Sequence, residues 1–231
     1  MRREEHALEL LDRPMPVADL AATLNDLDYF NDRYGGHWLG VRAVTRRLAG
    51  IPRDRRVVVI DVGGGRGDFA LRLVAWARKE RRRIHVIVLD RDEQTAALAR
   101  HHCDGAPEIS VVRGDATTLP VREGGVDVAI SLLTLHHLDV DAAATMLSEM
   151  RAAARDALVI VDLPRHPLAW FAVWLTTRLK RCHRITKHDG PLSVRRAYSV
   201  PELRELAAKA RLSSVSVRRF PAQMRVVMVA S

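Results

Sequence analysis

Short apolar runs recur along the first two thirds of the chain and set its predicted architecture. They cover residues 57–62, 84–90, 109–113, 126–132 and 157–163. Each run is almost continuously apolar, which is typical of strands buried on both faces of a parallel sheet. Helical periodicity separates several of them, over residues 68–80, 92–102 and 141–153. This alternation predicts an α/β fold with a doubly wound, mostly parallel sheet.

The two ends of the chain depart from this alternation. The runs VSVRRF and MRVVMVA are separated only by PAQ, which predicts an antiparallel hairpin that completes a seven-stranded sheet. We expect one domain of four parts. They are a helical cap over residues 1–50, a core over 55–163, an inserted substrate lid over 164–199, and a last helix and hairpin over 200–231. Within the lid, the polar stretch 187–199 is expected to be a loop.

Composition limits the class of protein. The chain has 231 residues, 48% of them hydrophobic, which is enough for one substantial core. The opening MRREEHALELLDRP is charged and lacks the apolar stretch of a signal peptide, and no apolar run reaches the ~20 residues needed to cross a bilayer. Cys103 and Cys182 form neither a CxxC pair nor a zinc spacing. We therefore expect a cytoplasmic protein with free thiols and no metal site.

The net charge of +9 comes mostly from arginine, since only four of the 37 basic residues are lysine. Such an excess can attract nucleic acid, an anionic lipid surface or an acidic carrier protein. No aromatic-interleaved nucleic-acid motif accompanies it, so a solvated surface is favoured and nucleic acid is not an expected partner. Peripheral contact with a membrane or with an acidic carrier protein remains an alternative for its partners.

Candidate chemistry begins at the turn after the first strand, in VVVIDVGGGRGDF. A glycine-rich turn into a helix lets a ligand approach backbone N–H groups at the positive end of that helix. Residues 65–70 formally satisfy the dinucleotide pattern G-x-G-x-x-A, and a turn of this kind also suits S-adenosylmethionine (SAM). Asp61 favours SAM, because its carboxylate would repel a pyrophosphate and attract the cationic methionine end of SAM.

Two further acids follow the next strands. Asp90 ends the second strand, where a carboxylate can accept hydrogen bonds from both ribose hydroxyls in SAM and NAD alike. Asp115 follows the third strand and is placed to accept from an adenine amino group. Because the carboxyl ends of parallel strands meet at one edge, we expect these acids to line one crevice with Asp61.

These segments resemble a known family. IDVGGGRGDF resembles motif I of the class I SAM-dependent methyltransferases, VLDRDE motif II, RGDATTLP motif III and VDVAISLLTLHHL motif IV with the turn after it. The resemblance covers about residues 55–163. It is strongest to the small-molecule branch around the ubiquinone/menaquinone-biosynthesis C-methyltransferases.

The resemblance implies roles for individual residues. The turn would cradle the methionine moiety, Asp90 would bind the ribose, and Ser131 would contact the methionine part. The implied cofactor-binding set is Asp61, Gly63, Gly65, Gly67, Asp90, Arg91, Asp115, Ala116 and Ser131. Where many nucleic-acid and protein N-methyltransferases have Asn/Asp-Pro-Pro-Tyr/Phe, residues 131–134 read Ser-Leu-Leu-Thr, which disfavours a planar amino-group acceptor.

Candidate catalytic and acceptor residues lie in two places. His136 and His137 follow the fourth strand, and His136 is predicted to be a general base if the acceptor must lose a proton. A capping or packing role is the alternative. In the lid, Trp170 and Trp174 share one helix face and are predicted to cover a hydrophobic acceptor, unless they are core residues. Arg195 or Arg196 is predicted to hold an acceptor oxyanion.

The predicted function is SAM-dependent methyl transfer to oxygen or carbon of a hydrophobic small molecule, of an aromatic, quinone-like or polyketide-like kind. Two alternatives stay open, an RNA-modifying methyltransferase and a non-catalytic SAM-binding protein. An NAD oxidoreductase is disfavoured because no Tyr-x-x-x-Lys pair is present. Nothing in the sequence indicates an oligomeric state.

Overall fold

A seven-stranded sheet forms the centre of the computed structural model, which describes residues 1–231. The strand order is β3-β2-β1-β4-β5-β7-β6. The strands are β1 (Val57–Val62), β2 (Ile84–Asp90), β3 (Ile109–Arg113), β4 (Val126–Leu132), β5 (Ala154–Asp162), β6 (Ser216–Phe220) and β7 (Arg225–Ala230). The first five are parallel, and β7 runs antiparallel between β5 and β6. The predicted mostly parallel sheet with a closing hairpin is confirmed.

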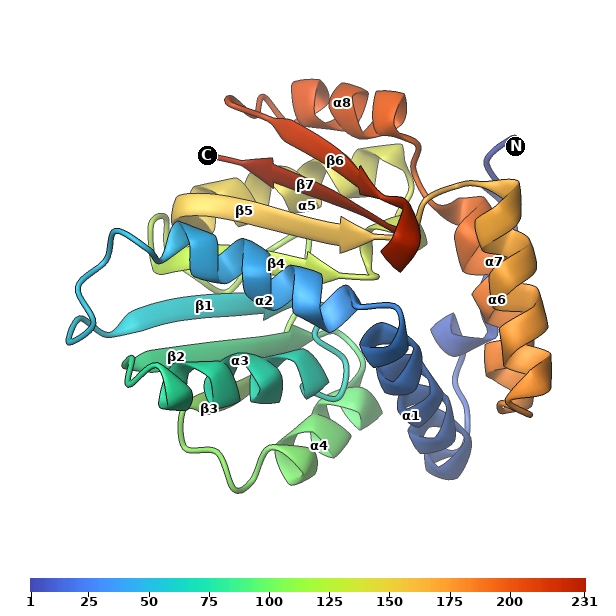
Figure 1. Ribbon diagram of the computed structural model, residues 1–231, viewed down its shortest axis with the longest axis horizontal. Coiled ribbons are helices and arrows are strands. Elements are labelled where there is room, and N and C mark those ends of the chain that lie inside the picture. Colours follow the sequence, from blue (N-terminus) through green and yellow to red (C-terminus); the bar gives the residue numbers. More distant parts are fainter.

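Helices cover both faces of the sheet (Figure 1). On one face, α2 (Gly36–Arg47) and α3 (Asp68–Lys79) pack against Val57 and Val59 of β1. On the other, α5 (Val140–Ala153) and α8 (Val200–Lys209) pack against Ile60 and Val62. The alternate residues of one strand are therefore buried on opposite faces, which explains why its apolar run is continuous.

The predicted strand bounds agree closely with the structure, with one clear difference. Strand β5 begins at Ala154, three residues before the predicted 157–163. Its first residues include the polar Arg155 and Asp156, and its pairing with β4 shifts register between Val126 and Val128. A polar, irregular strand start carries no apolar signal, so the sequence pattern missed it. Helix α4 (Glu93–His102) follows β2 as predicted.

Helical segments from both ends of the chain gather beyond the carboxyl ends of the parallel strands (Figure 1). They are η1 (Leu10–Asp12), α1 (Val17–Arg33), α6 (Pro167–Leu179) and α7 (Arg184–Arg196). Two short 3-10 turns complete the chain, η2 (Leu135–His137) after β4 and η3 (Pro221–Gln223) within the hairpin. No helix is both long enough and apolar enough to span a bilayer.

Helix α7 corrects the prediction of a loop over residues 187–199. The Gly190-Pro191 pair suggested a break, yet Pro191 lies inside the helix and is itself buried. Proline removes one backbone hydrogen bond, so the helix must gain stability elsewhere. It does so by packing against α6, α1 and η1. Asp189 adds to this, because its carboxylate accepts the backbone N–H groups of Leu10 at 2.9 Å and Leu11 at 2.8 Å.

Candidate cofactor and acceptor cavity

One large cavity opens at the carboxyl ends of the parallel strands. Its volume is about 1360 Å³, and it is lined by the glycine turn, the loops after β2, β3 and β4, and residues of η1, α1, α6 and α7. Pockets for a single small molecule usually measure ~300–1,000 Å³. The cavity is therefore large enough for a cofactor and a second molecule side by side.

The glycine turn joins β1 to α3 with positive φ angles at Gly63, Gly65 and Gly67. A Cβ atom at Gly67 would lie 2.6 Å from the sulfur of Cys103, so packing alone requires glycine there. At Gly65 the nearest atom to a Cβ would be a Leu24 methyl carbon at 3.9 Å, which means that this residue faces open space. The backbone of Gly65 is thus the part of the turn that a ligand can approach most closely.

Asp61, at the end of β1, is a buried acid without a partner. Its residue is 1% exposed, and neither carboxylate oxygen has a hydrogen-bond partner. Burial, followed by the like charges of Asp90 and Asp68, raises the pKa of Asp61 to about 8. A buried ionised carboxylate is unfavourable unless it is paired. Because Asp61 also lines the cavity, a cationic group of a ligand is the natural partner.

Asp90 and Asp115 lie on the same cavity wall, as predicted. Asp90 accepts hydrogen bonds from the backbone N–H of Gly65 at 3.1 Å and of Asp92 at 3.0 Å. Its burial nevertheless raises its pKa. Asp115 accepts from the hydroxyl of Thr117 at 2.6 Å and from its N–H at 2.7 Å, and these bonds lower the pKa of Asp115. Each acid keeps acceptor capacity for a ligand hydroxyl or amino group.

The remaining predicted cofactor residues divide into two groups. Arg91 and Ala116 line the cavity beside the acids. Ser131 does not, and its buried hydroxyl donates to the carbonyl of Val62 at 2.7 Å. Thr134, which was not predicted, lines the cavity instead and donates to the carbonyl of Gly63 at 3.3 Å. The only sequence feature that could have indicated Thr134 is its position just after the end of a predicted strand.

His136 and His137 belong to η2 after β4 and line the same cavity, each bonded to an acid. The Nδ1 atom of His136 lies 2.7 Å from Asp162, which also accepts the backbone N–H of His136 at 3.2 Å. Burial would raise the pKa of Asp162, but His136 and further hydrogen bonds hold it below its usual range. The Nδ1 atom of His137 lies 3.2 Å from Asp12 of η1. Burial would lower the pKa of His137, but Glu9 and Asp12 outweigh it and raise that pKa to about 8.

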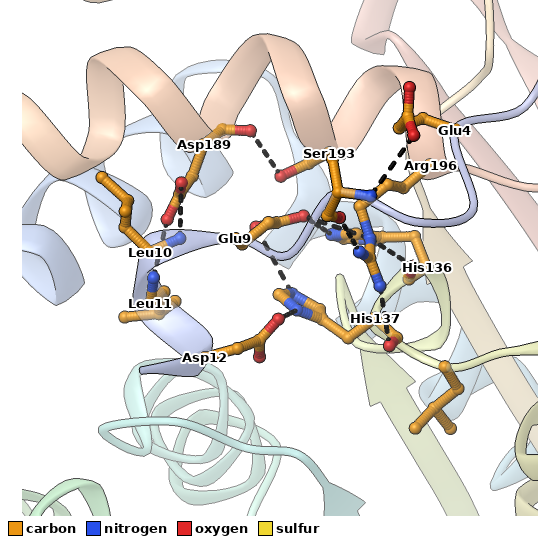
Figure 2. Close-up of polar contacts among 12 residues, drawn as sticks. Glu4, Glu9, Leu10, Leu11, Asp12, His136, His137, Asp189, Ser193 and Arg196 are labelled. Carbon is orange, nitrogen blue, oxygen red and sulfur yellow. Dashed lines mark hydrogen bonds and ion pairs between the residues drawn. The ribbon is translucent and has the colours of Figure 1, made fainter. Parts of the chain in front are cut away.

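Glu9 is a site residue that the sequence analysis missed. It precedes η1, is 2% exposed, and faces both histidines (Figure 2). Its Oε1 lies 3.7 Å from Nε2 of His136, and its Oε2 lies 3.8 Å from Nε2 of His137. No local pattern distinguishes Glu9 from the neighbouring Glu4 and Glu5. Only the folding of the N-terminal segment across η2 brings it to the cavity.

Comparisons with known proteins agree with this geometry. Residues 59–157 match the family model described as a methyltransferase domain. Residues 59–157 therefore resemble a methyltransferase domain. Over 126 residues it is 32% identical to the ubiquinone/menaquinone biosynthesis C-methyltransferase UbiE of Caulobacter vibrioides, covering 50% of this chain and 48% of the relative. The chain thus spans about half the length of that relative.

Solved structures support the fold of the methyltransferase domain. A SAM-dependent methyltransferase from Aquifex aeolicus superposes with a TM-score of 0.58 at 18% identity, covering 82% of this chain and 88% of that one. A structure from Methanococcus maripaludis, described as a candidate SAM-dependent methyltransferase, gives a TM-score of 0.65 at 14% identity and covers 95% of both chains. The predicted resemblance to class I methyltransferases is confirmed.

Helices α6 and α7 cover one side of the methyltransferase cavity, but not through the residues predicted for this role. Val173 and Thr177 of α6 line the cavity, whereas Trp170 and Trp174 do not. The two tryptophan rings stack on each other with centroids 6.4 Å apart, and the Arg178 guanidinium lies 4.5 Å from the Trp174 ring centroid. The tryptophans therefore lie on another face of α6. Their periodicity places both on one helix face but does not show which way that face points.

The two arginines of α7 are likewise outside the cavity lining. Arg195 is exposed and pairs with Glu4 at 2.7 Å. Arg196 is buried, and its guanidinium donates to the carbonyls of Ala7, His136 (3.2 Å) and His137 (2.9 Å). These three bonds fasten η2 to the N-terminal segment, and Arg196 does not line the cavity in which an acceptor oxyanion would lie.

Proposed function

We propose that this protein transfers a methyl group from SAM to oxygen or carbon of a hydrophobic small molecule. The observation that carries the proposal is Asp61, a buried carboxylate without a partner beside the glycine turn. SAM presents an ammonium and a sulfonium, and either cation would relieve that charge. A dinucleotide would instead bring a pyrophosphate next to Asp61, Asp68 and Asp90, where like charges repel.

Each part of SAM has a matching group on the cavity wall. The proposal places the methionine end at Asp61 and Gly65, the ribose hydroxyls at Asp90, and the adenine at Asp115 and Ala116. All five residues line the one cavity. The set supplies carboxylate acceptors and open backbone, and the arginines beside it are already engaged, Arg66 with Asp68 and Arg91 with Asp12, which suits a ligand without phosphate groups.

The acceptor is proposed to be hydrophobic because apolar side chains line the cavity where the N-terminal helix and α6 approach it. They are Met15, Leu20, Leu24, Leu27, Phe30 and Val173. The chemistry is an in-line displacement, in which the bond from sulfur to the methyl carbon breaks as the bond from the acceptor forms, and the protein contributes mainly alignment. His136 as the base for an acidic acceptor remains a prediction.

Calorimetry with three ligands tests this function. We expect SAM and its demethylated product S-adenosylhomocysteine (SAH) to bind with one-to-one stoichiometry, and NADH to give no comparable heat. Asp90→Ala should weaken SAH binding by about 10–100-fold, the usual cost of losing charge-assisted hydrogen bonds, ~1.5–3 kcal/mol. Tight NADH binding combined with indifference to SAH would refute the proposal.

A further inference from the structure

A cluster of one carboxylate and two imidazoles, none of them part of the glycine turn, lines the cavity. We propose that Glu9, His136 and His137 bind a divalent transition-metal ion, a site that the sequence analysis did not anticipate. One ligand atom from each residue lies within 4.8 Å of the others. The three residues line the same cavity as the glycine turn, and Figure 2 shows the Glu9 carboxylate directed towards the paired histidine rings.

The distances within the cluster suit an ion between the side chains better than direct hydrogen bonds. Each Nε2 atom lies 3.7 or 3.8 Å from a Glu9 oxygen, beyond hydrogen-bond range. Ligands bound to one ion at ~2.0–2.2 Å lie ~3–3.5 Å apart, so the two Glu9–histidine separations are only a few tenths of an ångström above the range for a shared ion. Glu9 Oε1 is buried without a hydrogen-bond partner, although burying such an oxygen is costly.

A second layer of acids orients both imidazoles. Asp162 contacts Nδ1 of His136 at 2.7 Å, and Asp12 contacts Nδ1 of His137 at 3.2 Å. When each Nδ1–H donates to its acid, the lone pair of each Nε2 points towards Glu9. Metal-binding histidines are usually held in this way by a carboxylate on the other ring nitrogen. Two independent histidine–carboxylate pairs that converge on a third acid are more than packing requires.

The nearest cation does not occupy the proposed site. Arg196 lies 3.8 Å from Glu9 Oε1, but its N–H groups donate to the carbonyls of Ala7, His136 and His137. It therefore ties the backbone that carries the two histidines to the segment that carries Glu9. In the structure Arg196 thereby holds the three ligands in place.

The donor set identifies the class of ion. Two imidazoles and one carboxylate suit Zn²⁺, Fe²⁺, Co²⁺ or Ni²⁺ better than Mg²⁺ or Ca²⁺, which prefer oxygen ligands. Three protein ligands also leave coordination positions open to the cavity, as in catalytic metal sites.

The role of the ion rests on the proposed function, whereas its binding does not. An acceptor hydroxyl bound at an open position would release its proton to solvent more readily. The resulting oxyanion would then bond to the methyl carbon as the carbon–sulfur bond of SAM breaks, leaving neutral SAH. An imidazole nitrogen bound to the metal cannot accept a proton, so this site would replace His136 as the predicted base.

Metal titration of chelator-treated, dialysed protein tests the site. We expect one equivalent of Zn²⁺ to bind by calorimetry, and one equivalent of Co²⁺ to give visible absorption bands typical of nitrogen and oxygen ligands. Glu9→Gln and His137→Ala should each weaken Zn²⁺ binding at least tenfold, and Asp12→Asn about tenfold through loss of orientation. His102→Ala is the matched control, because His102 also pairs with an acid, Asp68, at 2.9 Å outside the cluster.

SAH binding, measured on the same samples, separates this inference from the proposed function. Glu9→Gln should leave SAH affinity within threefold while Zn²⁺ binding falls. Absence of stoichiometric Zn²⁺ and Co²⁺ binding by the wild type overturns the site, whatever SAH does. Equal Zn²⁺ affinity in wild type, Glu9→Gln and His137→Ala overturns it as well. If a variant unfolds, the wild-type stoichiometry and Co²⁺ spectrum decide alone.

Discussion

Replacing Asp61 by asparagine should stabilise the ligand-free protein and weaken its binding of SAM. In the folded protein the pKa of Asp61 is raised from 3.8 to about 8. A raised pKa means that the folded state holds its proton more tightly than the unfolded state does. The associated stability is fully present below pH ~4 and is lost as the pH rises towards 8.

The magnitude follows from the width of this window. Each pH unit inside it removes up to ~1.4 kcal/mol, so at pH 7 the wild type has lost up to ~4 kcal/mol relative to pH 4. Relaxation of the protein around the charge reduces this loss of stability. We therefore expect Asp61→Asn to be about 2–4 kcal/mol more stable than wild type at pH 7. The difference should shrink towards zero near pH 4, because both side chains are then neutral.

Urea unfolding of both proteins between pH 5 and 8 measures the difference, and calorimetry with SAH measures the functional cost. We expect SAH affinity to fall about 10–100-fold in Asp61→Asn, since a charge-assisted contact is lost. Asp115→Asn is the control, because hydrogen bonds from Thr117 lower the pKa of Asp115 and its loss should not stabilise the protein. Parallel stability curves for wild type and Asp61→Asn across this pH range would show that the carboxylate is not an uncompensated charge.

Three further predictions follow from the contacts. Gly65→Ala should reduce SAH affinity at least tenfold, because the added methyl group would occupy ligand space. Gly124→Ala is the matched control and should not reduce it, since φ is +56° at Gly65 and +59° at Gly124 and both face open space. Equal SAH affinity in the two variants would contradict a ligand at Gly65. Arg196→Ala should lower the free energy of unfolding by about 2–4 kcal/mol, because three carbonyls lose their donor. Arg195→Ala, at an exposed residue, should change it by less than ~1 kcal/mol. Similar urea midpoints for the two variants would contradict the role of Arg196 in holding η2 to the N-terminal segment. Trp174→Ala should leave the SAH dissociation constant within threefold, and a larger change would place Trp174 in the cofactor site.

The fold and the cofactor-binding residues of the cavity could be predicted from the sequence, because both depend on local patterns and on a simple order of strands and helices. Continuous apolar runs marked the buried strands, and the carboxyl ends of parallel strands meet at one edge. That rule alone brings Asp61, Asp90 and Asp115 to a single cavity. The bond from the Ser131 hydroxyl to Val62 could not be predicted, because the pattern gives a residue's position along a strand but not which neighbour its hydroxyl will bond.

The part of the cavity proposed to hold the acceptor could not be predicted from the sequence in the same way. The Gly190-Pro191 pair argued for a loop, and only tertiary packing of α7 against α6, α1 and η1 overrides that local preference. Glu9 reaches His136 and His137 because the N-terminal segment crosses η2, a contact between distant parts of the chain. No spacing rule connects them.

The buried acids of this protein separate into two kinds, and the difference points to its ligands. Asp127 accepts the N–H of Val58 and pairs with Arg55, and Asp189 accepts two backbone N–H groups, so these carboxylates are satisfied by the fold itself. Asp61 and Glu9 alone among the carboxylates retain buried oxygens without a hydrogen-bond partner. An unsatisfied buried charge lowers stability, and it persists only where something completes it. Both line one cavity, which is the arrangement expected if a cationic cofactor and a metal ion together complete the site.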